Sequence, residues 1–130
     1  MADVLIVDDR PDIRYALARV LESAGHTVTE APARDARSLL DRPVELVICD
    51  IQHPLGDGQR LIRDAARRQP DAKLVAVVAD GLASSPASLA RARSHGVDAV
   101  LRVPIEFDPL LGTVERLLGE KPVGRQQLFA

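Results

Sequence analysis

The sequence predicts an α/β protein whose parallel sheet is covered by helices on both faces. Short runs rich in Val, Ile and Leu alternate five times with longer stretches whose apolar residues recur at helical spacing. Such continuous apolar runs suit strands that are buried on both faces of a sheet, and parallel neighbours are joined by crossover helices. Five strand–helix pairs in alternation therefore indicate one sheet with helices packed on either side.

The first half of the chain predicts three strands and two helices. The strands are expected at Val4–Val7, Thr27–Ala31 and Glu45–Cys49, and the helices at Pro11–Ala24 and Ala33–Asp41. A proline is tolerated in the first turn of a helix, where its missing N–H has no partner to lose. The glycine that follows the first of these helices is a typical helix stop.

The second half continues the alternation. A helix opens at Gly58 and ends by Pro70, a strand covers Leu74–Val78, a helix starts at Ser85 and ends at Gly96, a strand covers Ala99–Val103, and a last helix opens at Asp108. The domain is expected to span residues 1–119, and 120–130 to form a tail or linker. An open sheet of five parallel strands commonly has the flavodoxin-like order 2-1-3-4-5, in a three-layer α/β/α arrangement.

Composition excludes several classes of protein. Of the 130 residues 46% are hydrophobic, which is enough for one domain with a real core. Aromatic residues make up only 2%, and the formal net charge is -2, so neither stacking platforms nor a basic patch for nucleic acid are expected. Membrane-spanning and signal-peptide patterns are missing, and one cysteine allows no internal disulfide. We expect a cytoplasmic domain that binds neither nucleic acid nor membrane.

Three aspartates lie at the ends of two strands that are neighbours in this order. Asp8 and Asp9 follow the first strand and Asp50 follows the third, so their carboxylates should meet at one edge of the sheet. Like charges disfavour each other's ionisation unless a cation compensates, and Mg²⁺ prefers carboxylate and phosphate oxygens. A carboxylate beside Mg²⁺ can attack a phosphoryl group and form an aspartyl-phosphate. Each aspartate alone is more typical of a turn or helix cap, and only the combination favours such a site.

These residues make the chain resemble the receiver domain of two-component response regulators. Val4–Asp9 is similar to the family's opening strand with its acidic pair, and Leu46–Asp50 to the strand that carries the phosphoacceptor. The loop from Asp50 to Gly58 has a proline and an Asp-Gly pair at the family's offsets from the acceptor. The resemblance covers residues 3 to about 119, which is nearly the whole chain.

The resemblance implies a role for each matching residue. Asp50 would accept a phosphoryl group from a histidine kinase or phosphotransfer protein, in a domain that signals and is not an enzyme. Asp9 would bind Mg²⁺ directly, Asp8 would bind it through water, and the backbone carbonyl of Gln52 would complete the protein ligands. Family members often pair through the fourth helix, fifth strand and fifth helix, so a homodimer is expected by resemblance only.

The chain departs from the family at three positions that respond to phosphorylation. The hydroxyl residue expected at the end of the fourth strand is Ala79, and the lysine expected after the fifth is Val103. The usual aromatic residue within the fifth strand is Val100. We therefore expect an altered switch.

Three neighbouring residues have unexceptional interpretations. Strand alternation turns Arg102 to the face opposite Val103. Arg10 follows the acidic pair and is within reach of the pocket edge, although a solvated arginine is the more common case. Cys49 is expected to be a small core residue and not a nucleophile.

Three functions are compatible with this pattern. The first is a phosphoacceptor with an altered switch. The second is a pseudo-receiver, a protein-interaction module that works without phosphorylation. The third, a small phosphatase or nucleotide-binding protein, is disfavoured because the chain has no P-loop, no Gly-rich fingerprint after the first strand and no second acid two residues after Asp50.

Overall fold

Five strands alternate with five helices in the part of the chain that the computed structural model describes, residues 2–51, 57–79 and 86–119. The strands are β1 (Asp3–Val7), β2 (Thr27–Ala31), β3 (Leu46–Asp50), β4 (Lys73–Ala79) and β5 (Ala99–Val103). The helices are α1 (Pro11–Ser23), α2 (Ala33–Leu39), α3 (Asp57–Arg68), α4 (Pro86–Ser94) and α5 (Phe107–Gly119). The predicted tail at 120–130 lies outside the described residues.

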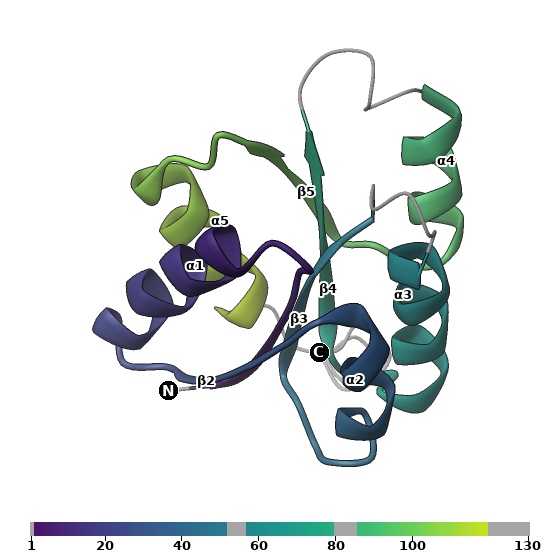
Figure 1. Cartoon of the computed structure of the whole chain (residues 1–130), viewed down its shortest axis with the longest axis horizontal. Coiled ribbons are helices and arrows are strands. Elements are labelled where there is room, and N and C mark those ends of the chain that lie inside the picture. The colour runs from purple at the N-terminus through teal and green to yellow at the C-terminus, as the bar shows by residue number, and fades with distance from the viewer. Residues whose placement is uncertain (1, 52–56, 80–85, 120–130) are drawn as a thin grey trace, which may run out of the picture.

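The strands form one parallel sheet in the order β2-β1-β3-β4-β5, which confirms the predicted topology. Figure 1 shows the two layers of helices, with α1 and α5 on one side of the sheet and α2, α3 and α4 on the other. In the pairing of β1 with β3, Val7 lies opposite Cys49. The residues that follow these two strands therefore meet at one edge of the sheet.

The core consists of two apolar layers that share the central strands. Alternate side chains of β1, β3 and β4 point to opposite faces, as the period of an extended chain requires. One layer packs against α1 and α5 and contains Val4, Ile6, Leu46, Ile48, Val75, Val77, Leu17, Leu21, Leu110, Val114 and Leu117. The other packs against α2, α3 and α4 and contains Leu5, Val7, Val47, Cys49, Ala76, Val78, Ala36, Leu61, Ile62, Ala65 and Ala92.

The glycines that stop two helices and the ends of β1, β2 and β5 were predicted correctly. Gly25 and Gly96 have φ angles of 98° and 104°, a left-handed conformation that favours glycine, and each follows a helix as expected. By contrast, β3 extends to Asp50, one residue further than predicted, because Asp50 still pairs with Val77 of β4. Strand ends depend on the neighbouring strand, which the local pattern does not reveal. Ser85, the predicted start of α4, lies outside the described residues.

Within the described ranges, no helix combines the length and apolar character that crossing a membrane requires.

Candidate functional site

The predicted acidic edge of the sheet is built by the ends of β1 and β3. Asp8 follows β1 and is 2% exposed, and Asp50 ends β3 and is 8% exposed. Both carboxylates therefore lie in a largely desolvated environment, where an unpaired charge is costly. Arg10 contacts both, since its Nη2 lies 2.9 Å from Asp8 Oδ2 and 3.7 Å from Asp50 Oδ2. The structure brings Asp8 and Asp50 together around one guanidinium.

Arg10 donates three N–H groups to a single carboxylate, that of Asp8. Its backbone N–H and its Nε both donate to Asp8 Oδ1, at 2.9 and 3.0 Å, while Nη2 donates to Asp8 Oδ2. Two parallel bonds between a guanidinium and a carboxylate are stronger and more directional than a single ionic contact. The hydrogen bond to Asp8 raises the pKa of Arg10, burial opposes this, and the charges of Asp8, Asp50 and Asp12 add to the rise.

Of the two interpretations of Arg10, contact with the edge of the pocket is the one that the structure shows, and part of the side chain is solvated as well. Arg10 precedes the first residue of α1 and has an extended backbone, with φ −95° and ψ 104°. This conformation places the guanidinium against Asp8, two residues earlier, while part of the side chain still reaches solvent. The spacing Asp-x-Arg was the available signal in the sequence, but the direction of the side chain depends on loop dihedral angles.

Asp9 reaches the start of α2. Its Oδ1 accepts a hydrogen bond of 2.8 Å from the backbone N–H of Ala33, the first residue of that helix. Asp9 therefore satisfies one of the N–H groups that a helix start leaves without an intrahelical partner. The cap interpretation is thus correct for Asp9, although the capped helix is α2 and not the helix that follows it in sequence.

The three carboxylates nevertheless act on one point of the core. Burial raises the pKa of the Cys49 thiol well above its ordinary value, and the negative charges of Asp50, Asp8 and Asp9 raise it further. Cys49 is fully buried one residue before Asp50. Its place in the core confirms that it is a packing residue, because a buried thiol with a raised pKa is a poor nucleophile.

Gly58 allows α3 to begin directly beside the backbone of Asp50. A Cβ atom at residue 58 would lie 1.9 Å from the Asp50 carbonyl oxygen and 2.8 Å from Ile51 Cα. Both are impossible contacts with backbone atoms, so only glycine permits this approach. Steric exclusion of a Cβ atom therefore explains why the second residue of the Asp-Gly pair, Gly58, is a glycine.

The three positions at which the sequence is expected to depart from the family lie on β4 and β5. Ala79 pairs with Val103, and Val100 pairs with Ala76. Val103 packs against the layer of α1 and α5, where it also lines an apolar pocket of about 280 Å³ with Ile13 and Leu17. Neither Val100 nor Val103 has a charged or hydroxyl-bearing side chain.

The carboxylates at this edge of the sheet suit a hard cation, but several of their oxygens already accept hydrogen bonds from N–H groups. Carboxylates such as those of Asp8, Asp9 and Asp50 are ligands that Mg²⁺ prefers. In residues 2–51, 57–79 and 86–119, however, no three His, Cys, Asp or Glu side chains are grouped for metal binding. Arg10 bonds both oxygens of Asp8, and Ala33 bonds Asp9. The fourth predicted ligand, Gln52, lies outside the described residues.

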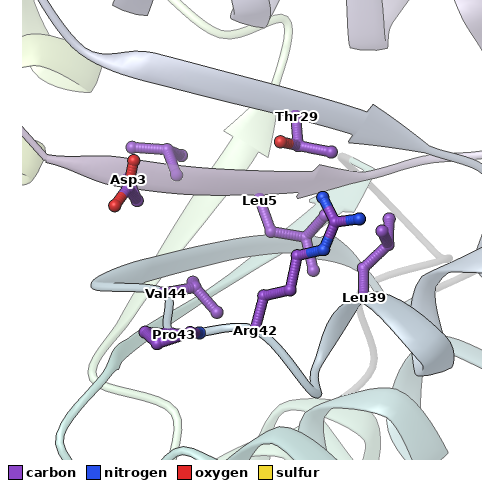
Figure 2. A pocket seen from close by; sticks show the side chains of 8 residues that line it. Asp3, Leu5, Thr29, Leu39, Arg42, Pro43 and Val44 are labelled. Carbon is purple, nitrogen blue, oxygen red and sulfur yellow. The ribbon is translucent and has the colours of Figure 1, made fainter.

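A second cavity, of about 220 Å³, lies on the face of the sheet that α2 covers. Figure 2 shows the Arg42 side chain extending toward Leu5 and Thr29, with Leu39 and Val44 beside it. It contains none of the predicted site residues.

Comparison with known proteins gives a family match over most of the chain. The model of the response regulator receiver domain matches residues 4–115. The response regulator receiver protein CpdR of Brucella abortus is 31% identical over 121 residues, covering 91% of this chain and 98% of that protein. The hydrogenase transcriptional regulatory protein HoxA of Cupriavidus necator is 31% identical, covering 88% of this chain but 24% of its own length. This chain thus spans about a quarter of HoxA.

A solved structure agrees with the fold. The CheY-like response regulator receiver domain protein of Methanospirillum hungatei superposes with a TM-score of 0.82 at 25% identity. The superposition covers 91% of this chain and 94% of the other.

Proposed function

We propose that this chain, which belongs to the response regulator receiver domain family of two-component systems, accepts a phosphoryl group on Asp50. The donor would be a histidine kinase or a phosphotransfer protein, and the reaction would need Mg²⁺. The observation that carries the proposal is the position of Asp50, a buried carboxylate at the end of the central strand β3 and beside Asp8 and Arg10. A carboxylate so placed is a suitable nucleophile for phosphoryl transfer.

In this mechanism a carboxylate oxygen of Asp50 attacks the phosphorus of a phosphohistidine. The O–P bond of an acyl phosphate forms, the N–P bond breaks, and the electron pair of that bond returns to the imidazole nitrogen. Asp8, Asp9, Asp50 and the Gln52 carbonyl would hold Mg²⁺, which neutralises charge on the phosphoryl oxygens when bound. Holding the metal requires Asp8 to exchange its bonds with Arg10 for a water or the ion.

The response to phosphorylation is proposed to differ from that of other receivers. A hydroxyl, a lysine and an aromatic residue are replaced by Ala79, Val103 and Val100. Loss of the lysine removes a charge-assisted contact of about 1.5–3 kcal/mol from beside the phosphoryl group. The phosphorylated state is therefore expected to form more slowly and to move β4 and β5 less.

Amide NMR with Mg²⁺ and beryllofluoride, a phosphoryl mimic, tests the phosphoacceptor role of Asp50. The expected result is a set of shifts at Ile51, Gly58 and the end of β1, which surround Asp50. The Asp50→Asn variant should show none of them, because the mimic needs a carboxylate oxygen. Identical spectra with and without the mimic in the unmodified protein would contradict the proposal.

A phosphorylation-independent pseudo-receiver is the second candidate, and Val103 at the lysine position is the observation that favours it. It predicts that Asp50→Asn leaves partner binding and cellular phenotype unchanged. A loss of phenotype in this variant, at normal protein level and unfolding midpoint, would exclude it.

The proposal extends to a homodimer formed through α4, β5 and α5. Exposed charges of both signs lie on these elements, among them Arg91, Arg93, Arg102, Glu115 and Arg116. Light scattering across a range of concentrations, with and without beryllofluoride, would detect such a dimer. Activities of longer relatives, such as transcriptional regulation by HoxA, would need further domains beyond the matched part.

A further inference from the structure

Arg10 differs from an arginine in an ordinary surface ion pair, because the carboxylate that it binds is buried. Its partner Asp8 is almost completely buried, whereas the Arg10 side chain is 37% exposed, so one part of it faces the carboxylates and another reaches solvent. Its backbone N–H bonds the same carboxylate as its side chain, which fixes the loop together with the charge. By comparison, Arg19 pairs with Glu22 and Glu30 on the open surface of α1.

The pocket gathers negative charge, and the family's usual cation is absent. Burial is the main cause of the raised pKa of Cys49, and the charges of Asp50, Asp8 and Asp9 all add to it, so the three carboxylates lie near one another. The lysine position, at the end of β5, is occupied by Val103, which packs in an apolar layer. Arg10, with its Nη2 within 4 Å of Asp50 Oδ2, carries a positive charge at the place where a phosphoryl group would be attached.

We propose that Arg10 is the cation of this pocket: it pairs with Asp8 in the unmodified protein and contacts the phosphoryl group once Asp50 carries one. The inference rests on the phosphoacceptor role of Asp50. A guanidinium is permanently charged and presents several N–H donors in a plane, a geometry that matches phosphate oxygens as well as carboxylates. The exposed part of the side chain leaves it room to turn from Asp8 toward the new group.

The proposal predicts two effects of opposite sign when the charge is removed. Phosphoryl transfer slows, because the transferred group loses a charge-assisted contact. Mg²⁺ binds more tightly, because a positive charge that repels it and holds Asp8 is gone. A residue that served the fold alone would not slow transfer while strengthening metal binding.

The experiment compares Arg10→Ala, Arg10→Gln and Arg10→Lys with the unmodified protein. Transfer from acetyl phosphate in saturating Mg²⁺ is followed by intact mass, and Mg²⁺ affinity is measured separately by calorimetry. We expect Arg10→Ala and Arg10→Gln to be phosphorylated about tenfold more slowly or worse, and to bind Mg²⁺ about fivefold more tightly. Arg10→Lys keeps the charge but loses the planar donors, so its transfer rate should lie between those of the unmodified protein and Arg10→Gln, with a Mg²⁺ affinity within about threefold of the unmodified protein.

Arg19→Gln is the matched control, because it removes the same charge from an exposed position of α1. It should change neither measurement. Unfolding midpoints identify any variant that does not fold; if Arg10→Ala fails, the pair Arg10→Gln and Arg10→Lys decides, since both keep a long side chain.

The outcomes separate this inference from the proposed function. Equal transfer rates in the unmodified protein, Arg10→Gln and Arg10→Lys would overturn the role of Arg10 and leave Asp50 as the acceptor. Equally slow transfer in Arg10→Lys and Arg10→Gln would overturn it too, because charge would not be the cause. An unmodified protein that takes no phosphoryl group would overturn the proposed function and, with it, the contact with Arg10.

Discussion

At the scale of single residues, the chemistry of the site depends on how buried polar groups find partners. Asp8 is buried, and a buried carboxylate needs a partner, which the guanidinium of Arg10 provides with two side-chain hydrogen bonds. The position of Asp8 and Asp50 at one edge could be predicted, because strand ends follow from apolar runs. The pairing with Arg10 could not, because it depends on the backbone angles of a single loop residue.

Cys49 provides a prediction about pH. Its pKa is raised by burial and then by the charges of Asp50, Asp8 and Asp9, so above the ordinary thiol pKa of about 8.5 the unfolded chain loses this proton while the folded chain keeps it. The free energy of unfolding should therefore fall as pH rises above that value.

Urea unfolding of the unmodified protein and of Cys49→Ala between neutral and alkaline pH measures this effect. The two curves of stability against pH should diverge above the thiol's ordinary pKa, the unmodified protein declining more steeply. Parallel curves would show that the thiol titrates alike in both states. Ellman's reagent should also leave the native thiol unmodified and react with it in urea.

At the scale of elements, side chains from distant segments fix where helices and strands begin. The N–H of Ala33 at the start of α2 bonds the Asp9 carboxylate, 24 positions earlier in the chain. At the start of β5, Asp98 is bonded twice to Leu74 of β4, its N–H donating to the carbonyl at 2.7 Å and its Oδ2 accepting from the N–H at 2.8 Å. Local sequence decides that these elements form, whereas contacts with distant segments decide at which residue each one begins.

Removing the Asp98 carboxylate should loosen the start of β4 and β5. We expect Asp98→Ala to lower the free energy of unfolding by about 1 kcal/mol, which is typical for one lost hydrogen bond. Asp98→Asn keeps an oxygen acceptor and should lose less than half of this. Urea titrations give the energies, and faster hydrogen exchange at the Leu74 amide in the alanine variant would locate the effect; unchanged exchange there would contradict it.

At the scale of the whole molecule, the two apolar layers share β1, β3 and β4, so neither layer can unfold without the other. Ile48 is fully buried in the layer of α1 and α5, while Val47 and Cys49 on either side of it face α2, α3 and α4. This sharing follows from the parallel order with β3 at the centre. It also makes the position of Asp50 rigid, because the strand that ends there is buried along its whole length.

We expect Ile48→Ala to lower the free energy of unfolding by about 2–5 kcal/mol, the range for deleting a buried Ile side chain. Unfolding should remain a single transition by near- and far-ultraviolet circular dichroism, since both layers depend on β3. Val28→Ala on the edge strand β2, where the side chain is only partly buried, is the control and should cost less than half as much. Two separated transitions for Ile48→Ala would mean that the layers fold independently.

The sequence by itself determined the alternation of strands and helices and the parallel class. It favoured the order 2-1-3-4-5, and with it one edge for Asp8 and Asp50, only as the common arrangement of five such strands, and the structure confirmed that order. These features follow from apolar periodicity and from crossover rules, which need only local information and a short list of topologies. The tertiary structure alone decided that Arg10 bonds Asp8 and reaches Asp50, that Asp9 caps α2, and that residue 58 must be glycine. Each of these depends on loop backbone angles or on atoms of a distant segment, and no residue pattern along the chain specifies either.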